Sequence, residues 1–75
     1  MDAENLVKMA NQIGDFFAAF PDRAEALDGI AGHIRKFWAP PMRRQLLAHV
    51  DASGAAAGVS PIVNEALQAY REQLA

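Results

Sequence analysis

Hydrophobic residues recur every three or four positions along four stretches of the chain, and proline, glycine and capping residues separate those stretches. Such spacing places apolar side chains along one side of an α-helix. The pattern predicts helices over residues 3–19, 23–37, 41–52 and 61–74. No run of alternating apolar and polar residues indicates a strand. We therefore expect an all-α fold in which residues 1–75 form one small domain of about four short helices.

Capping residues mark the ends of these helices. Asp22 is typical of an N-cap and has Glu25 at capping-box spacing, while Ser60 and Pro61 form an N-cap and N1 pair. A proline ends each of the first two helices, and Gly54 follows the third. The side chains that these helices are expected to bury are Leu6, Met9, Ala10, Ile13, Phe16, Phe17, Phe20, Leu27, Ile30, Ala31, Ile34, Phe37, Trp38, Met42, Leu46, Leu47, Val50, Ile62, Val63, Ala66, Leu67, Tyr70 and Leu74.

Two glycines lie inside the second predicted helix. Gly29 and Gly32 each cost up to about 1 kcal/mol relative to alanine in a helix interior. Both fall on the side opposite the apolar stripe, so packing of the core does not explain them. We expect another chain to approach closely at these positions.

Length, charge and hydropathy exclude several classes of protein. A chain of 75 residues and 8.1 kDa is one domain, too short for a two-domain enzyme, a barrel or a doubly wound nucleotide fold. A net charge of −2 gives no reason to expect nucleic acid or an anionic membrane as partner. No apolar run approaches the roughly 20 residues of a membrane span, and the acidic, polar start is unlike a signal peptide. We expect a cytoplasmic location.

The sequence offers little of the chemistry that catalysis requires. Cysteine and threonine are absent, which excludes disulfides, thiolate metal sites and Cys-ligated iron–sulfur clusters. Ser60 is better explained as a helix cap and Ser53 as a turn residue. His33 and His49 lie on different predicted helices without a second ligand at metal-binding spacing, so we expect them to hydrogen-bond to backbone or to a partner. No catalytic, cofactor-binding or metal-binding residue is expected.

Basic residues are concentrated in one segment. Residues 35–50 contain four bases and no acid. Lys and Arg in the last turn of the second helix complement its dipole, but cations near the start of the third helix are unfavourable. Aromatic residues, Met and Arg are enriched at protein interfaces. The sequence therefore predicts a partner-binding site made of His33, Arg35, Lys36, Phe37, Trp38, Pro40, Met42, Arg43 and Arg44, with Gly29 and Gly32 beside it.

Within this predicted site, Trp38 and Arg43 are assigned the main contacts. Trp38 comes at the end of an apolar stripe, so we expect part of its ring to stay available as an anchor. Arg43 lacks a local rationale near a helix start, and we expect it to bind a partner carboxylate or carbonyl. A solvated basic cluster and a nucleic-acid-binding segment remain alternatives, the latter weakened by the adjacent prolines and the acidic total.

Short runs spread over nearly the whole chain resemble one known family. The ordered set resembles the small delta subunit of NAD-dependent, molybdenum- or tungsten-containing formate dehydrogenases. Two local departures are Pro41, where a basic or polar residue is expected, and an alanine-rich loop over residues 53–59. The runs that carry the resemblance are Met9-Ala10-Asn11-Gln12-Ile13-Gly14, Phe16-Phe17, Pro21-Asp22-Arg23, Gly29-Ile30-Ala31, His33-Ile34, Phe37-Trp38, Pro40, Met42-Arg43, Leu47-Ala48-His49 and Pro61-Ile62-Val63.

The resemblance implies a function within a larger enzyme. It implies a cytoplasmic complex that oxidises formate and reduces NAD, in which other subunits hold a bis-pterin molybdenum or tungsten centre, iron–sulfur clusters, FMN and the NAD site. This chain would then be a non-catalytic accessory subunit that binds the large catalytic (alpha) subunit and supports complex stability or cofactor assembly. The alternative is a free-standing helical regulator that binds nucleic acid or another protein through residues 35–50.

Overall fold

The computed structural model describes residues 2–75 and confirms the all-α fold class. Four longer helices and a short C-terminal helix account for most of these residues, and none of the described residues is in a strand. The elements are α1 (Ala3–Phe17), α2 (Arg23–Phe37), α3 (Pro40–Ser53), the 3₁₀ helix η1 (Gly54–Ala57), α4 (Pro61–Ala69) and α5 (Arg71–Leu74).

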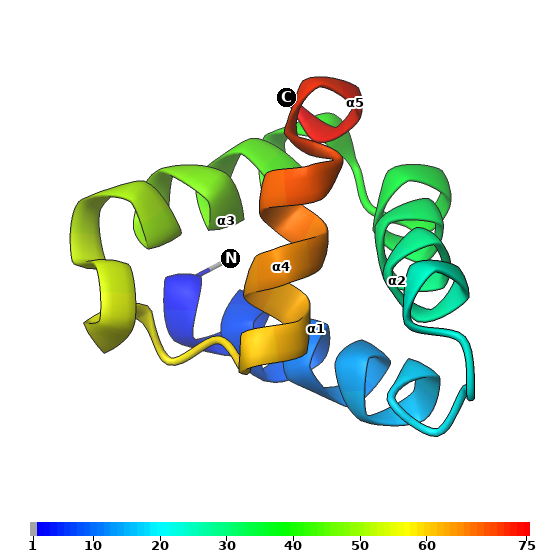
Figure 1. The fold of residues 1–75 in the computed structure, drawn as a ribbon. Coiled ribbons are helices and arrows are strands. Elements are labelled where there is room, and N and C mark those ends of the chain that lie inside the picture. Colours follow the sequence, from blue (N-terminus) through cyan, green and yellow to red (C-terminus); the bar gives the residue numbers. More distant parts are fainter. Residues whose placement is uncertain (1) are drawn as a thin grey trace.

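The helices surround a single core. In Figure 1, α1 runs along the bottom of the view, α2 stands at the right, α3 crosses the top, and α4 lies in front. Helix α4 packs on both α1 and α2, and α5 contacts α2 and α3. The largest side chains that are almost completely buried come from all of these helices except η1: Leu6, Ile30, Ile34, Leu46, Val63, Leu67 and Leu74. Burying one such side chain contributes about 1.5–3 kcal/mol.

Aspartate caps begin the first two helices. Asp22 accepts hydrogen bonds from the backbone N–H groups of Ala24 (2.8 Å) and Glu25 (3.3 Å), which confirms it as the N-cap of α2. Asp2 caps α1 in the same way through Asn5 N–H (2.8 Å). These bonds satisfy amide groups that have no partner within the helix.

Ser60 occupies the predicted N-cap position of α4, but its hydroxyl makes no capping bond. The Oγ atom is buried and has no hydrogen-bond partner among residues 2–75. The segment is held instead by Asn11 of α1, whose Oδ1 accepts from Ser60 N–H (2.9 Å) and whose Nδ2 donates to Gly58 O (3.0 Å). Ser60 is thus the N-cap residue with proline following it, as predicted, but its side chain makes no capping bond.

The observed bounds depart from the predicted ones by more than one residue at two places. Helix α1 ends at Phe17, two residues before the predicted end. The predicted helix 61–74 is interrupted at Tyr70, whose backbone angles (φ −115°, ψ 24°) are not helical. The interruption redirects the last turn, α5, so that Leu74 is buried where α5 meets α2 and α3. Gly54, with φ of +54°, ends α3 in a conformation that favours glycine, as expected.

Candidate docking surface

The predicted partner-binding residues lie along the second half of α2, the turn after it and the start of α3. The structure brings them to one end of the molecule but exposes them unequally. His33, Arg35, Lys36, Phe37, Pro40 and Arg44 are exposed, whereas Gly29, Gly32, Met42 and Arg43 are half-buried and Trp38 is buried.

Trp38 belongs to the core. Only 5% of its surface is exposed, and it packs among the buried side chains of α1, α2 and α3. Its backbone N–H donates to Ile34 O (3.0 Å) at the end of α2. The expectation that part of the ring stays available as an anchor is wrong, because the second helix ends close enough to α1 and α3 for the indole to be enclosed.

Arg43 has a local role that sequence reasoning missed. Its Nε donates to Leu74 O (3.2 Å), and its Nη1 donates to Arg35 O (3.2 Å) and Trp38 O (3.3 Å). The guanidinium therefore binds backbone carbonyls at the C-terminal ends of both α2 and α5, where positive charge is favourable. A partner contact for Arg43 stays a prediction, but its premise, the absence of a local rationale, is wrong.

The two glycines of α2 differ. A Cβ atom at Gly29 would lie 2.3 Å from Cε1 of Phe17, so the close approach at this position comes from the same chain. The statement that intramolecular packing does not explain Gly29 is wrong. A Cβ atom at Gly32 would meet nothing within 4 Å, so the fold itself does not require this glycine.

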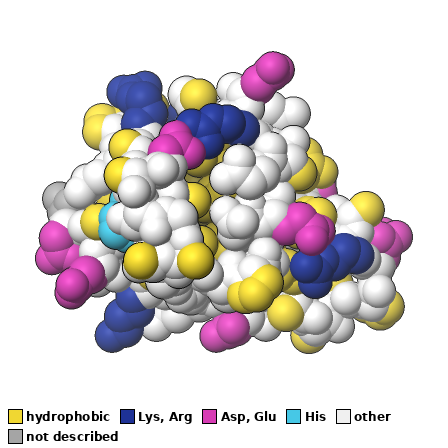
Figure 2. Space-filling view, turned by 60° about the vertical axis from the view of Figure 1, so that its left-hand side comes forward, with side chains coloured by type: hydrophobic (Ala, Val, Ile, Leu, Met, Phe, Trp, Pro, Cys, Tyr) yellow, Lys and Arg dark blue, Asp and Glu magenta, His cyan; other side chains and the backbone are white. Residues whose placement is uncertain are grey.

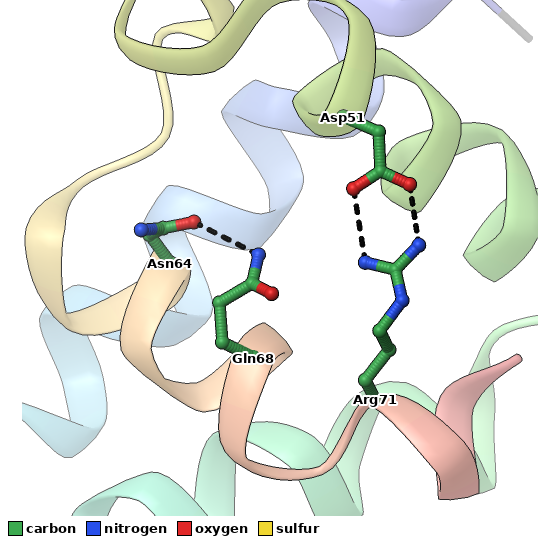
Figure 3. A network of polar contacts seen from close by, with 4 residues as sticks. All are labelled: Asp51, Asn64, Gln68 and Arg71. Carbon is green, nitrogen blue, oxygen red and sulfur yellow. Dashed lines mark hydrogen bonds and ion pairs between the residues drawn. The ribbon is translucent and has the colours of Figure 1, made fainter.

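Apart from Arg43, the lysines and arginines fall into two groups. Arg23 forms an ion pair with Glu65 (3.1 Å), and Arg71 pairs with Asp51. Figure 3 shows the second pair beside the Asn64–Gln68 hydrogen bond. Hydrogen bonds from the two arginines lower the pKa values of Glu65 and Asp51, with Coulombic attraction acting in the same direction and partial desolvation opposing it.

In the second group, Lys8, Arg35, Lys36 and Arg44 form no ion pair within the described part of the chain. Arg35 and Lys36 are in the last turn of α2, where they complement its dipole. On the face drawn in Figure 2, charges of both signs are scattered rather than gathered into one basic area.

An aromatic face extends the predicted site onto α1. It consists of Phe16, Phe17, Phe20, His33 and Phe37. The ring of Phe17 lies between those of Phe16 and Phe20 in sequence and contacts both: the Phe16–Phe17 centroids are 5.0 Å apart with the rings edge to face, and the Phe17–Phe20 centroids are 5.1 Å apart with the rings tilted. His33 and Phe37 form a second ring pair at 4.8 Å. Three of the phenylalanines are exposed: Phe16 (67%), Phe20 (38%) and Phe37 (72%).

The sequence pattern predicts that these three phenylalanines are buried, and that prediction is wrong because all three are exposed. For Phe16, the one of the three that lies on α1, the apolar arc of the helix is wider than the surface that the other helices cover. An apolar stripe wider than a helix needs for its own core is the signal that could have identified this face.

A hollow of about 580 Å³ lies beside the aromatic face, between α1 and the C-terminal half of α2. We call it the aromatic hollow. No residue of α4 lines it, so it lies on the side of α1 that α4 leaves uncovered. Its lining consists of Met9, Gln12, Ile13, Phe16, Phe17, His33 and Trp38. A smaller adjoining hollow, about 270 Å³, is lined by Phe17, Asp28, Gly29, Gly32, His33, Lys36 and Phe37.

His49 of α3 has a hydrogen-bond partner within the chain. Nε2 of His49 lies 3.0 Å from Ala57 O, which confirms the expected backbone hydrogen bond for this histidine. No group of three or more His, Cys, Asp or Glu that could hold a metal ion occurs within residues 2–75. Across the same residues, no helix is long and apolar enough to cross a membrane.

Comparison with known proteins identifies the family. No curated protein and no solved structure matches the chain. The family model described as NADH-dependent formate dehydrogenase delta subunit FdsD matches residues 5–67, which extend from the first turn of α1 into the last turn of α4. The matched segment contains the aromatic face, both hollows beside it and the turn between α2 and α3. The chain therefore belongs to the family of NADH-dependent formate dehydrogenase delta subunits.

Proposed function

We propose that this chain is a non-catalytic accessory subunit of a cytoplasmic NAD-dependent formate dehydrogenase complex. In this proposal it binds the large catalytic subunit and supports complex stability or cofactor assembly. The observation that carries the proposal is the family match over residues 5–67. A small core with three exposed phenylalanines supports it, because such a domain gains stability by covering them with a partner.

We also propose that the redox groups of the complex belong to other subunits. These are the bis-pterin molybdenum or tungsten centre, the iron–sulfur clusters, FMN and the NAD site. The chain has no cysteine to bind an iron–sulfur cluster, and residues 2–75 contain no cluster of potential metal ligands. Both observations support a role that acts through protein contact.

A free-standing regulator is the second candidate. The observation that favours it is the set of cations without ion pairs, Arg35, Lys36 and Arg44, within the basic segment 35–50. A nucleic-acid target would require these cations to contact phosphates and would make binding strongly dependent on salt.

The test is co-expression with a tagged catalytic subunit, followed by affinity purification. We expect the chain to elute with the tagged subunit, and omission of the chain to lower either the pterin and metal content of the enzyme or its melting temperature. A lower pterin and metal content alone indicates a role in cofactor assembly. A lower melting temperature alone indicates a role in stability. If the chain elutes alone and instead retards DNA in a salt-dependent way, the regulator is correct.

A further inference from the structure

We propose that the aromatic hollow receives an apolar anchor side chain carried by an acidic segment of the catalytic subunit. This inference rests on the proposed function and specifies which surface docks and what chemistry it recognises. The docking surface is the aromatic face together with the two hollows beside it. It differs from the sequence-predicted site in two ways. It includes residues of α1, and Trp38 forms part of the wall of the hollow instead of protruding as an anchor.

The position of the hollow follows from how α1 is covered. One side of α1 packs on α4, where a Cβ atom at Gly14 would lie 2.6 Å from Cγ2 of Val63. Met9 and Phe16 lie on the other side of α1 and line the hollow. Because no residue of α4 reaches this side, the chain leaves an apolar concavity that its own helices do not fill.

The exposed rings cost the isolated chain stability that a partner would restore. Burying a phenylalanine is worth about 1.5–3 kcal/mol, and Phe16 and Phe37 are both more than half exposed. They flank the aromatic hollow and the adjoining hollow, respectively, and His33 lines both. Aromatic side chains around a concavity are typical of the central, water-excluded part of an interface.

Charge around the adjoining hollow selects an acidic partner. Lys36 lines this hollow beside Phe37 and forms no ion pair within residues 2–75. Asp28, the acid in the same lining, interacts with Tyr70, whose pKa is raised first by burial and then by this carboxylate. Lys36 thus remains the cation available to an incoming carboxylate, with Arg35 next to it in the last turn of α2.

Gly32 provides an independent observation. It lines the adjoining hollow next to Lys36 and Phe37, and no atom of residues 2–75 outside its own helical surroundings approaches the position of its missing Cβ within 4 Å. A glycine in a helix interior is destabilising by up to about 1 kcal/mol, so a position with free space favours alanine unless something else comes close. A partner backbone passing over this turn of α2 accounts for the glycine.

The experiment uses the co-expressed complex with a tagged catalytic subunit. Phe16→Ser and Phe37→Ser alter exposed side chains of the aromatic face, and Ala69→Ser is the control on the exposed surface of α4. We expect each phenylalanine variant to lower affinity for the catalytic subunit about tenfold or more, while the control binds like the wild type. Circular dichroism of each variant establishes that its helix content is retained.

A matched pair of lysine variants tests the charge. Lys36→Glu and Lys8→Glu reverse the same charge at two exposed helical positions, but only Lys36 lines the docking surface. We expect Lys36→Glu to weaken binding several-fold and to reduce its dependence on salt, whereas Lys8→Glu leaves both unchanged. Equal behaviour of the two variants contradicts an acidic partner.

Photocrosslinking identifies the occupant. With a benzophenone amino acid at position 37, the crosslinked peptide is expected to come from the catalytic subunit and to combine an apolar residue with Asp or Glu. A crosslink to a second copy of this chain, or to a basic segment, overturns the inference. If the wild type binds and the face variants bind equally well, this inference fails while the proposed function stands. If the wild type itself does not bind the catalytic subunit, the proposed function fails as well.

Discussion

The two sides of α1 differ in what covers them. On one side Gly14 lets α4 pack closely, and Asn11 fixes the segment before α4 through two hydrogen bonds. On the other side Met9 and Phe16 border a hollow that no helix of the chain fills. Away from α1, two exposed ion pairs join α4 to α2 and α5 to α3. The difference teaches that an apolar stripe on a helix does not by itself show which of its sides the other helices of the chain cover.

The largest expected contrast comes from truncating one side chain on each side. Leu67→Ala removes a buried side chain of α4 and is expected to lower the free energy of unfolding by about 2–5 kcal/mol. Phe16→Ala removes an exposed ring and is expected to cost less than about 1 kcal/mol. Urea denaturation followed by circular dichroism measures both. Similar losses for the two variants would show that the open side is as much a part of the core as the covered side.

Replacing Gly14 and Gly32 with alanine tests the same contrast between a packed and an open position. Gly14→Ala places a Cβ atom 2.6 Å from Val63 Cγ2, so we expect a loss of about 1–3 kcal/mol. Gly32→Ala adds a methyl group in free space and is expected to raise the free energy of unfolding by up to about 1 kcal/mol. Thermal denaturation of the isolated variants should therefore shift in opposite directions. A loss of stability in Gly32→Ala would mean that this turn is already packed within the chain.

Arg43 and Arg44 offer a matched pair on α3. Arg43→Ala removes the guanidinium that binds three backbone carbonyls, and we expect about 1.5–3 kcal/mol of destabilisation. Arg44→Ala removes an exposed cation and is expected to change stability by less than about 0.5 kcal/mol. Chemical denaturation distinguishes the two. Equal, small effects would contradict the structural role of Arg43.

The smallest expected effect is the pH dependence of stability that arises from the ion pairs Arg23–Glu65 and Arg71–Asp51. The lowered pKa values of Asp51 and Glu65 mean that the folded chain favours their ionised forms. Their contribution is therefore fully present above the unfolded-state pKa values of about 4 and is lost as pH falls through the lowered folded values. Melting temperatures from pH 7 to pH 3 should fall less steeply for Asp51→Asn/Glu65→Gln than for the wild type. An unchanged slope would show that these exposed pairs contribute nothing measurable.

The sequence predicts most of the fold because the signals for it are local. Helical periodicity, the Asp22 cap and the proline breaks identify the bounds of α2 and α3 to within about one residue. The break at Tyr70 could not be predicted in this way, because it depends on where the last turn packs against α2 and α3.

The sequence locates only part of the candidate site, because the rest of the site depends on contacts between helices. Lys36, Phe37 and His33 are exposed at the predicted end of α2. The burial of Trp38 and the carbonyl contacts of Arg43 depend on how the helices pack together, so the spacing of residues along one helix cannot predict them. The contribution of α1 to the aromatic face was missed because its phenylalanines fit the core stripe equally well.

The hydrogen bonds of Asn11 have a consequence for the order of events in folding. They join α1 to residues 47 and 49 positions further along the chain. Such distant partners meet only after the intervening helices have docked, because closing so long a loop is entropically unfavourable. We expect these bonds to form after the rate-limiting step of folding. They would then lower the rate of unfolding without raising the rate of folding. The side-chain amide of Asn11 therefore affects the lifetime of the native state more than it affects the rate of folding.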